Sequence, residues 1–110
     1  MALLKLGKIP YNEIEIDIYK DEARTPEFKK NINKFATVPA LMHQDEFFGE
    51  SNAIMVYLCE AFPEELSNYY GSNLIEKTRI NEYLSWYQSS FRPNMLAILM
   101  MRWRYAILLK

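Results

Sequence analysis

Few residues of this 110-residue chain have a type and a spacing that could do chemistry by themselves. The single cysteine, Cys59, lies in an apolar helical segment, where we expect a thiol buried in the core. The single histidine, His43, lies in a predicted turn, where we expect it to be solvated. No second metal ligand lies near this histidine at a usable spacing. The sequence therefore predicts neither a metal site nor a catalytic residue.

The composition excludes several classes of protein. Half of the residues are hydrophobic and 15% are aromatic, which is too apolar for a disordered chain. A formal net charge of -1 provides no global positive field for binding nucleic acid. One cysteine cannot close an intrachain disulfide, which suits an intracellular reducing compartment, cytoplasmic or mitochondrial. The most apolar run meets Arg102 and Arg104 before it reaches the ~20 residues of a membrane span, and the start does not resemble a signal peptide.

The first third of the chain predicts a helix end, a strand and a second helix. Gly7 is placed as the left-handed residue that ends a short helix beginning near Ala2. Apolar and acidic residues alternate strictly over Glu13–Ile18, which predicts a strand with its isoleucines on one face. Thr25 is followed by a proline and an acidic residue, which is typical of the start of a helix.

A hairpin and a helix follow. Residues 37–42 form a short apolar strand that contains Pro39, so the proline should lie at an edge, at the strand's start or after a cis bond. A turn then leads to a second strand over 46–49. Ser51 is the expected N-cap of the next helix, which Pro63 stops.

The remainder predicts a separate, helical region. A polar segment over 64–73 is interpreted as a linker, and a long helix over 74–110 is expected to kink or restart at Pro93. Residues 1–63 then form one domain. The predicted fold class is α/β: a truncated thioredoxin-like βαββα unit that lacks its first strand, followed by a long helix of an all-α second domain.

The final helix is apolar on nearly every side, so we expect other protein chains to cover it. The residues assigned to this partner interface are Met95, Leu96, Leu99, Trp103 and Ile107. After position 91 the charged residues are all basic, namely Arg92, Arg102, Arg104 and Lys110. These charges are either the solvated ends of a buried helix or a contact with a membrane surface or an acidic partner.

Four motifs in order resemble one protein family. Phe35–Leu41 reads FATVPAL and Glu50–Ile54 reads ESNAI, as in the N-terminal domain of glutathione S-transferases. Leu6–Tyr11 resembles the end of that family's first helix, and Asn81–Trp86 resembles the fourth helix of the theta class. The chain thus resembles a theta-class glutathione S-transferase reduced to its N-terminal domain and the first helix of its C-terminal domain. By this resemblance we expect the first strand and most of the helical domain to be absent.

The resemblance implies glutathione as the ligand and assigns Val38, Pro39, Glu50 and Ser51 to its site. In the family the bond before the proline is cis, and the main chain of the preceding residue, here Val38, pairs with the extended tripeptide. Ser51 at a helix N-terminus would bind the γ-glutamyl carboxylate, and Glu50 would bind the ammonium group. A cis proline and a serine cap also serve the fold without a ligand.

The same resemblance implies that the chain lacks the group that activates the glutathione thiol. The family's thiolate-activating hydroxyl follows its first strand, and a free thiol is little ionised at neutral pH. We therefore expect a catalytically degenerate protein that acts as a structural or accessory subunit of a larger hetero-oligomeric assembly. The alternatives are an active transferase that conjugates glutathione to small electrophiles and a non-catalytic glutathione-binding module. The strands beside the missing one should gain a strand from another chain or from upstream sequence, or pair directly.

Overall fold

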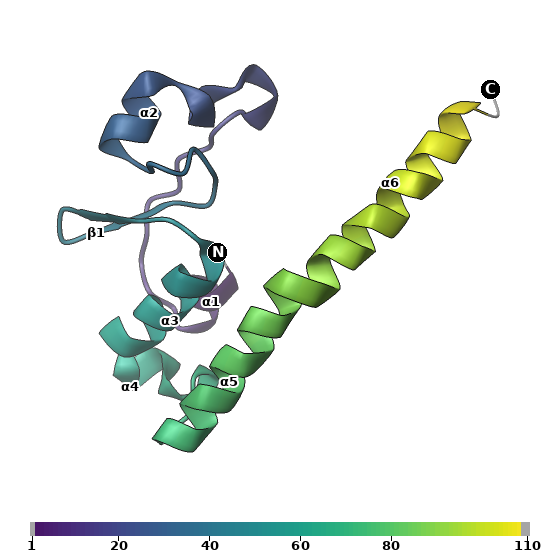
Figure 1. Ribbon diagram of the computed structural model, residues 1–110. Coiled ribbons are helices and arrows are strands. Elements are labelled where there is room, and N and C mark those ends of the chain that lie inside the picture. The colour runs from purple at the N-terminus through teal and green to yellow at the C-terminus, as the bar shows by residue number, and fades with distance from the viewer. Residues whose placement is uncertain (1, 109–110) are drawn as a thin grey trace. The chain divides into compact units, whose positions relative to one another are not determined.

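The computed structural model describes residues 2–108, with side chains described as far as Met101 in the last helix. The chain divides after Tyr70 into two compact units. Figure 1 traces the first unit in purple to teal and the second in green to yellow. The helices and strands of the first unit are α1 (Ala2–Leu6), α2 (Pro26–Asn31), β1 (Leu41–His43), β2 (Glu46–Phe48), α3 (Ser51–Ala61) and α4 (Pro63–Leu66). Short 3-10 turns complete it: η1 (Ile18–Lys20), η2 (Glu22–Arg24) and η3 (Ser67–Tyr69).

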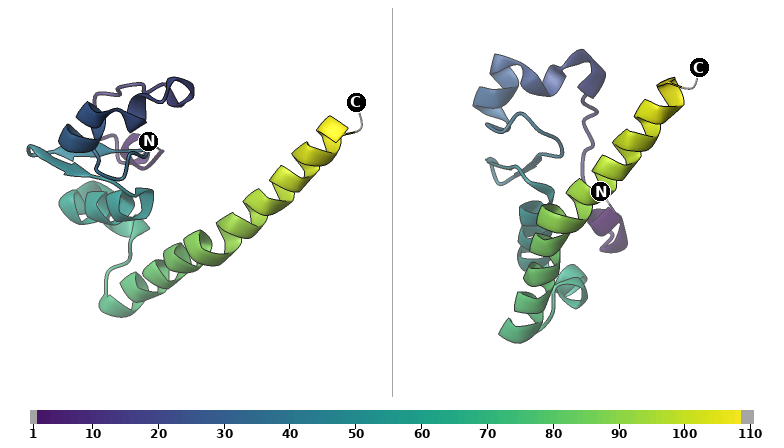
Figure 2. Two further views of the ribbon diagram at one scale, coloured as in Figure 1. Left: turned by 45° about the horizontal axis from the view of Figure 1, so that its top comes forward. Right: turned by 45° about the vertical axis from the view of Figure 1, so that its right-hand side comes forward.

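The sheet is a single antiparallel hairpin between α2 and α3, as all the views in Figures 1 and 2 show. Leu41 pairs with Phe48 at one end, and His43 pairs with Glu46 beside the turn. The predicted hairpin is confirmed, although the first strand begins only at Leu41. The peptide bond between Val38 and Pro39 is cis and precedes the strand, as the sequence predicted for this proline.

The predicted strand over Glu13–Ile18 is wrong. These residues have no regular structure until Ile18 opens η1, and Ile14 is 82% exposed. The side chain of Asp17 accepts hydrogen bonds from the main-chain N–H groups of the next turn. Alternation predicts which face a strand would bury, but a strand also needs a neighbour, and β1 and β2 pair only with each other in the part of the chain described here. The described residues thus form a two-stranded hairpin with helices, consistent with part of a thioredoxin-like domain, followed by a long helix.

Two helix starts and ends follow local rules. Thr25 is the N-cap of α2, and its hydroxyl accepts the N–H of Phe28 at 3.2 Å. The end of α1 is also confirmed, but the left-handed residue is Lys8, with φ of 53°, rather than Gly7. Gly7 instead permits close packing, since a Cβ there would lie 2.8 Å from the side chain of Leu66.

The core of the first unit joins the helices to the turn η2. The buried apolar side chains among the described residues are Leu4, Ala23, Phe28, Ile54, Leu58, Cys59, Leu66 and Tyr70. Leu66 is fully buried on α4, so the first residues of the predicted linker over 64–73 pack into this unit. The exact domain boundaries stay a prediction. Pro63 ends α3 as expected, and it begins α4 as that helix's first residue.

The second unit is helical: α5 (Leu74–Trp86), a π-helical turn η4 (Tyr87–Phe91) and α6 (Arg92–Leu108). The expected interruption at Pro93 takes the form of this π turn, in which the N–H of Arg92 donates to the carbonyl of Tyr87. Proline has no N–H for the carbonyl four residues earlier, so a changed hydrogen-bond pattern there is expected. Of the helices described, none has the length and apolar character needed to span a membrane.

The hairpin turn yields a stability prediction. Gln44 and Asp45 both have positive φ, 53° and 63°, which in a two-residue loop is the signature of a type I′ turn. Replacing them together by Asn-Gly should raise the free energy of unfolding by about 0.5–1 kcal/mol, because asparagine and glycine tolerate positive φ best. Urea unfolding of the full chain measures this change. The control Asp45→Ala should lower stability, and a gain of stability with alanine would contradict the turn assignment.

Candidate functional site

The hairpin brings the four predicted site residues to one end of the sheet. Pro39 lies two positions before β1, and Glu50 lies two positions after β2. Because the strands are antiparallel and Leu41 is paired with Phe48, both flanking segments leave the sheet at the end opposite the turn. The loop that carries Val38 and the start of α3 are therefore neighbours in the fold, although they are separated in sequence.

Asn33 connects the loop to the rest of this site. Its side-chain Nδ2 donates to the main-chain carbonyl of Thr37 at 2.8 Å and to the Thr37 hydroxyl at 3.2 Å. Its Oδ1 accepts the N–H of Phe35 at 3.1 Å. Asn33 is only 4% exposed and is the one buried polar residue in the described part of the chain. Sequence reasoning missed this residue, since nothing local marks a buried asparagine.

Glu50 and Ser51 form the start of α3 differently from the prediction. Ser51 is the first helical residue rather than the N-cap, and Glu50 occupies the cap position without a side-chain cap hydrogen bond. Glu50 has φ of 63° and ψ of 111°, a conformation that L-residues adopt at a cost. The carboxylate is exposed, and no cap from Glu50 covers the positive end of this 11-residue helix. The start of α3 therefore presents an exposed carboxylate beside the positive end of a helix.

The loop residues themselves are accessible. Val38 is 42% exposed, and Pro39 is exposed beside it. Val38 lies outside both strands, so its main-chain N–H and carbonyl are not used in the hairpin. An extended ligand could therefore pair with this residue as an added strand.

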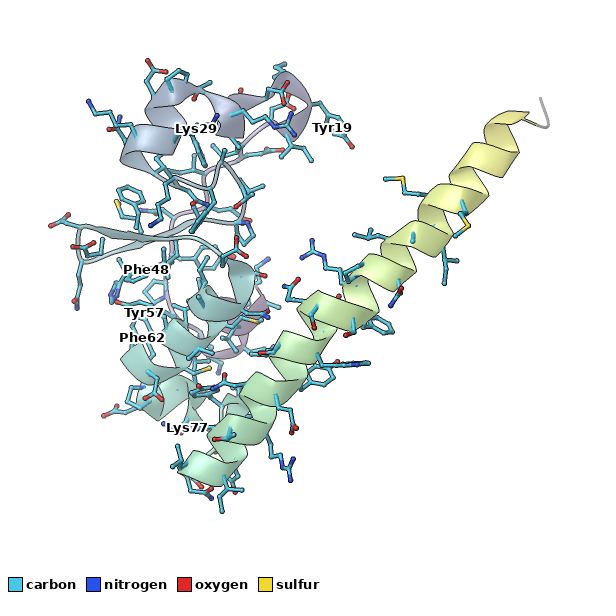
Figure 3. All side chains as sticks on the ribbon, viewed as in Figure 1. Tyr19, Lys29, Phe48, Tyr57, Phe62 and Lys77 are labelled. Atoms are coloured by element: carbon cyan, nitrogen blue, oxygen red, sulfur yellow. The ribbon has the colours of Figure 1, made fainter. Side chains whose placement is uncertain are left out.

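His43 corrects the expectation of a solvated turn residue. It is the last residue of β1 and is half-buried, and its Nδ1 lies 2.7 Å from the hydroxyl of Tyr57. Phe48 stacks on Tyr57 with ring centroids 4.2 Å apart, and Phe62 lies 5.4 Å from the His43 ring. Figure 3 shows Phe48, Tyr57 and Phe62 in succession beside α3. This cluster fixes the hairpin on α3, so its role is to support the site.

A hollow of about 320 Å³, which no sequence pattern predicted, lies between the end of α2 and the hairpin. Its lining is charged, with three lysines and two acidic residues: Lys29, Lys30, Lys34, Asp45 and Glu46. Lys34 lies over the ring of Phe35 at 5.2 Å. None of the four predicted site residues lines this hollow, but Asn33, Phe35 and Gly49 do.

The expected partner interface is exposed where it can be described. Met95, Leu96 and Leu99 on α6 are 37%, 43% and 52% exposed. The side chains of Trp103 and Ile107 lie outside the described residues, as do those of the basic residues Arg102, Arg104 and Lys110.

Cys59 is a core thiol, as predicted. It is buried on α3, and burial raises the pKa of its thiol, with a smaller contribution from the neighbouring carboxylate of Glu60. A thiol with a raised pKa forms little of the reactive thiolate at neutral pH. Cys59 is therefore suited to packing and not to nucleophilic chemistry.

The chain has recognisable relatives. A family model described as the N-terminal domain of glutathione S-transferase matches residues 1–84. The chain is 34% identical over 93 residues to glutathione S-transferase T3 of Arabidopsis thaliana, with 84% of this chain and 16% of that protein covered. It is 31% identical over 88 residues to human glutathione S-transferase theta-2, with 80% of this chain and 35% of that protein covered.

A solved structure shows the same fold. The crystal structure of poplar glutathione transferase F1 superposes with a TM-score of 0.75 at 29% identity, covering 84% of this chain and 43% of that chain. The chain thus spans less than half the length of each of these three relatives.

The raised pKa of Cys59 predicts a dependence of stability on pH. The folded state holds the thiol proton more tightly than the unfolded state, so this contribution is complete below the ordinary thiol pKa of about 8.5 and is lost as the pH rises above it. The free energy of unfolding should therefore fall with rising pH above that value. Urea titrations of the wild type and Cys59→Ala measure this: the variant should lack the thiol's share of the slope. Equal slopes would contradict the assignment.

Proposed function

The chain belongs to the glutathione S-transferase family, and we propose that the loop before β1 and the start of α3 together bind glutathione. The observation that carries this proposal is the register of the hairpin, because pairing of Leu41 with Phe48 places the two segments at one end of the sheet. Glutathione is an extended tripeptide with an amino acid group at its γ-glutamyl end. It therefore needs main-chain partners along its length and a charged pair at one end.

The loop supports the peptide part of this interaction. Val38 is exposed and lies outside the hairpin ladder, so its N–H can donate to the ligand and its carbonyl can accept from it. Pairing of this kind gains affinity from main-chain hydrogen bonds without requiring a particular side chain.

The start of α3 supports binding of the γ-glutamyl end. Ser51 begins the helix and provides a hydroxyl where the helix dipole is positive, which favours a carboxylate. The exposed carboxylate of Glu50, the residue before it, favours the ammonium group. The unusual backbone of Glu50 is also the kind of local strain that clusters at ligand clamps.

We further propose that the chain is catalytically degenerate and serves as an accessory subunit of a larger assembly. Conjugation requires a glutathione thiolate, and the residues assigned to the site provide groups for the main chain and the γ-glutamyl end of the ligand but no donor for its sulfur. The exposed apolar residues of α6 support a role in association, since contiguous apolar surface of this kind is unusual on an isolated chain.

Calorimetric titration tests glutathione binding. The full chain should bind with a dissociation constant of about 1 mM or tighter, equivalent to about -4 kcal/mol. Glu50→Gln and Ser51→Ala should each weaken binding about 5- to 10-fold, because each removes one partner of the γ-glutamyl group. Ser67→Ala, an exposed serine on η3, is the matched control and should bind as the wild type does. The proposal fails if the wild type gives no heat at millimolar glutathione.

A test of the accessory role requires protein isolated from its native source. Native mass spectrometry after gentle isolation should find this chain in an assembly with chains of other sequences. The purified chain should conjugate glutathione to 1-chloro-2,4-dinitrobenzene no faster than the uncatalysed reaction. A homodimer with ordinary transferase turnover would instead establish the active enzyme.

A further inference from the structure

We propose that Asn33 is a positioning residue that sets the spacing between the two halves of the glutathione site. This inference rests on the proposed binding function and identifies a residue within it. Asn33 belongs to neither half. It lies two positions after the end of α2, and its side chain is placed between the loop that carries Val38 and the turn that enters α3.

The hydrogen bonds of the carboxamide hold the loop on one side. Nδ2 donates twice to Thr37, which directly precedes Val38, and Oδ1 accepts from Phe35. A carbonyl can only accept and an N–H can only donate, so this set of partners fixes which way the amide faces. The main-chain carbonyl of Asn33 also accepts the N–H of Ala36 at 2.9 Å. Asn33 thus determines the course of the chain from Phe35 to Thr37.

Gly49 packs against the other side of the same carboxamide. A Cβ built on Gly49 would lie 2.7 Å from Oδ1, 2.9 Å from Nδ2 and 3.0 Å from Cγ of Asn33. These distances are too short for real atoms, so a side chain at position 49 would displace the amide. Gly49 directly precedes Glu50, so the amide fills the space between this turn and the loop.

The consequence is a fixed gap between the main chain of Val38 and the γ-glutamyl partners at Glu50 and Ser51. The loop has few other means of holding its course, since Phe35, Thr37 and Val38 are exposed. A buried amide with all its contacts made is rigid, because leaving any of its groups unpaired is costly. The ligand then binds a preformed spacing and loses less entropy on binding.

Two variants test this placement by opposite routes. Asn33→Asp keeps the size of the side chain and the acceptor for Phe35, but a carboxylate cannot donate to Thr37. Gly49→Ala keeps Asn33, but the added methyl group displaces its carboxamide. Each should weaken glutathione binding about 10-fold by calorimetry. Asn31→Asp makes the same charge change at an exposed asparagine on α2, and it should bind as the wild type does.

The two positions should also be coupled. Asn33→Ala opens the space that a methyl group at position 49 would fill, so adding Gly49→Ala to that variant should weaken binding no further. Additive losses would mean that Asn33 and Gly49 act on binding independently of each other. As a spectroscopic signature, the glutathione-induced shift of the Val38 amide resonance should be lost in Asn33→Asp and retained in Asn31→Asp. If Asn33→Asp or Gly49→Ala fails to fold, the other variant is compared with the wild type.

The outcomes separate the two proposals. Wild-type binding that Asn33→Asp and Gly49→Ala both retain would overturn the positioning role and leave the binding function standing. Additive losses in the Asn33→Ala and Gly49→Ala pair would also overturn it. Absence of binding by the wild type would overturn the binding function, and the positioning role with it.

Discussion

The antiparallel pairing of Leu41 with Phe48 is the interaction on which the rest of the first unit depends. Along the sequence the hairpin separates the loop before β1 from α3. In the fold, the pairing places this loop beside the start of α3. A two-stranded hairpin is marginally stable alone in water. The ring contacts of Phe48 and His43 with Tyr57 therefore matter, because they attach the hairpin to α3. The site is thus built on one small sheet and the helix that supports it.

Asn33 adds a second link between the same two segments, of a different kind. The hairpin sets which residues are neighbours, whereas the buried amide sets how far apart their main chains lie. Hydrogen bonds have direction and packing contacts have a minimum distance, so together they leave this part of the chain little freedom. A small hairpin can therefore still hold the loop before β1 and the start of α3 in a defined arrangement.

The features that the sequence predicted correctly depend on neighbouring residues. Thr25 caps α2 by accepting the N–H of the residue three positions later, and Pro63 ends α3 by its own covalent geometry. The hairpin follows from two apolar segments around a short turn. The misassigned caps at Gly7 and Ser51 are shifts of one residue, whereas the larger failures involve partners distant in sequence. Glu13–Ile18 lacks a strand to pair with, and His43 meets Tyr57, which lies on α3. For the site, the residue types were predictable from motifs, but the central place of Asn33 and Gly49 appeared only when the chain was folded.

The π turn over Tyr87–Phe91 changes the angular phase of the helix that follows it. It holds one residue more than the α-helical path would, which rotates everything beyond it by roughly 100° about the helix axis. The ring contact of Trp86 with Phe91 spans this turn, and Trp86 also contacts Tyr83 on α5, so this arrangement of rings depends on the extra residue. Loss of a single residue there would leave the sequence of α6 intact while turning its apolar side to a new direction relative to α5.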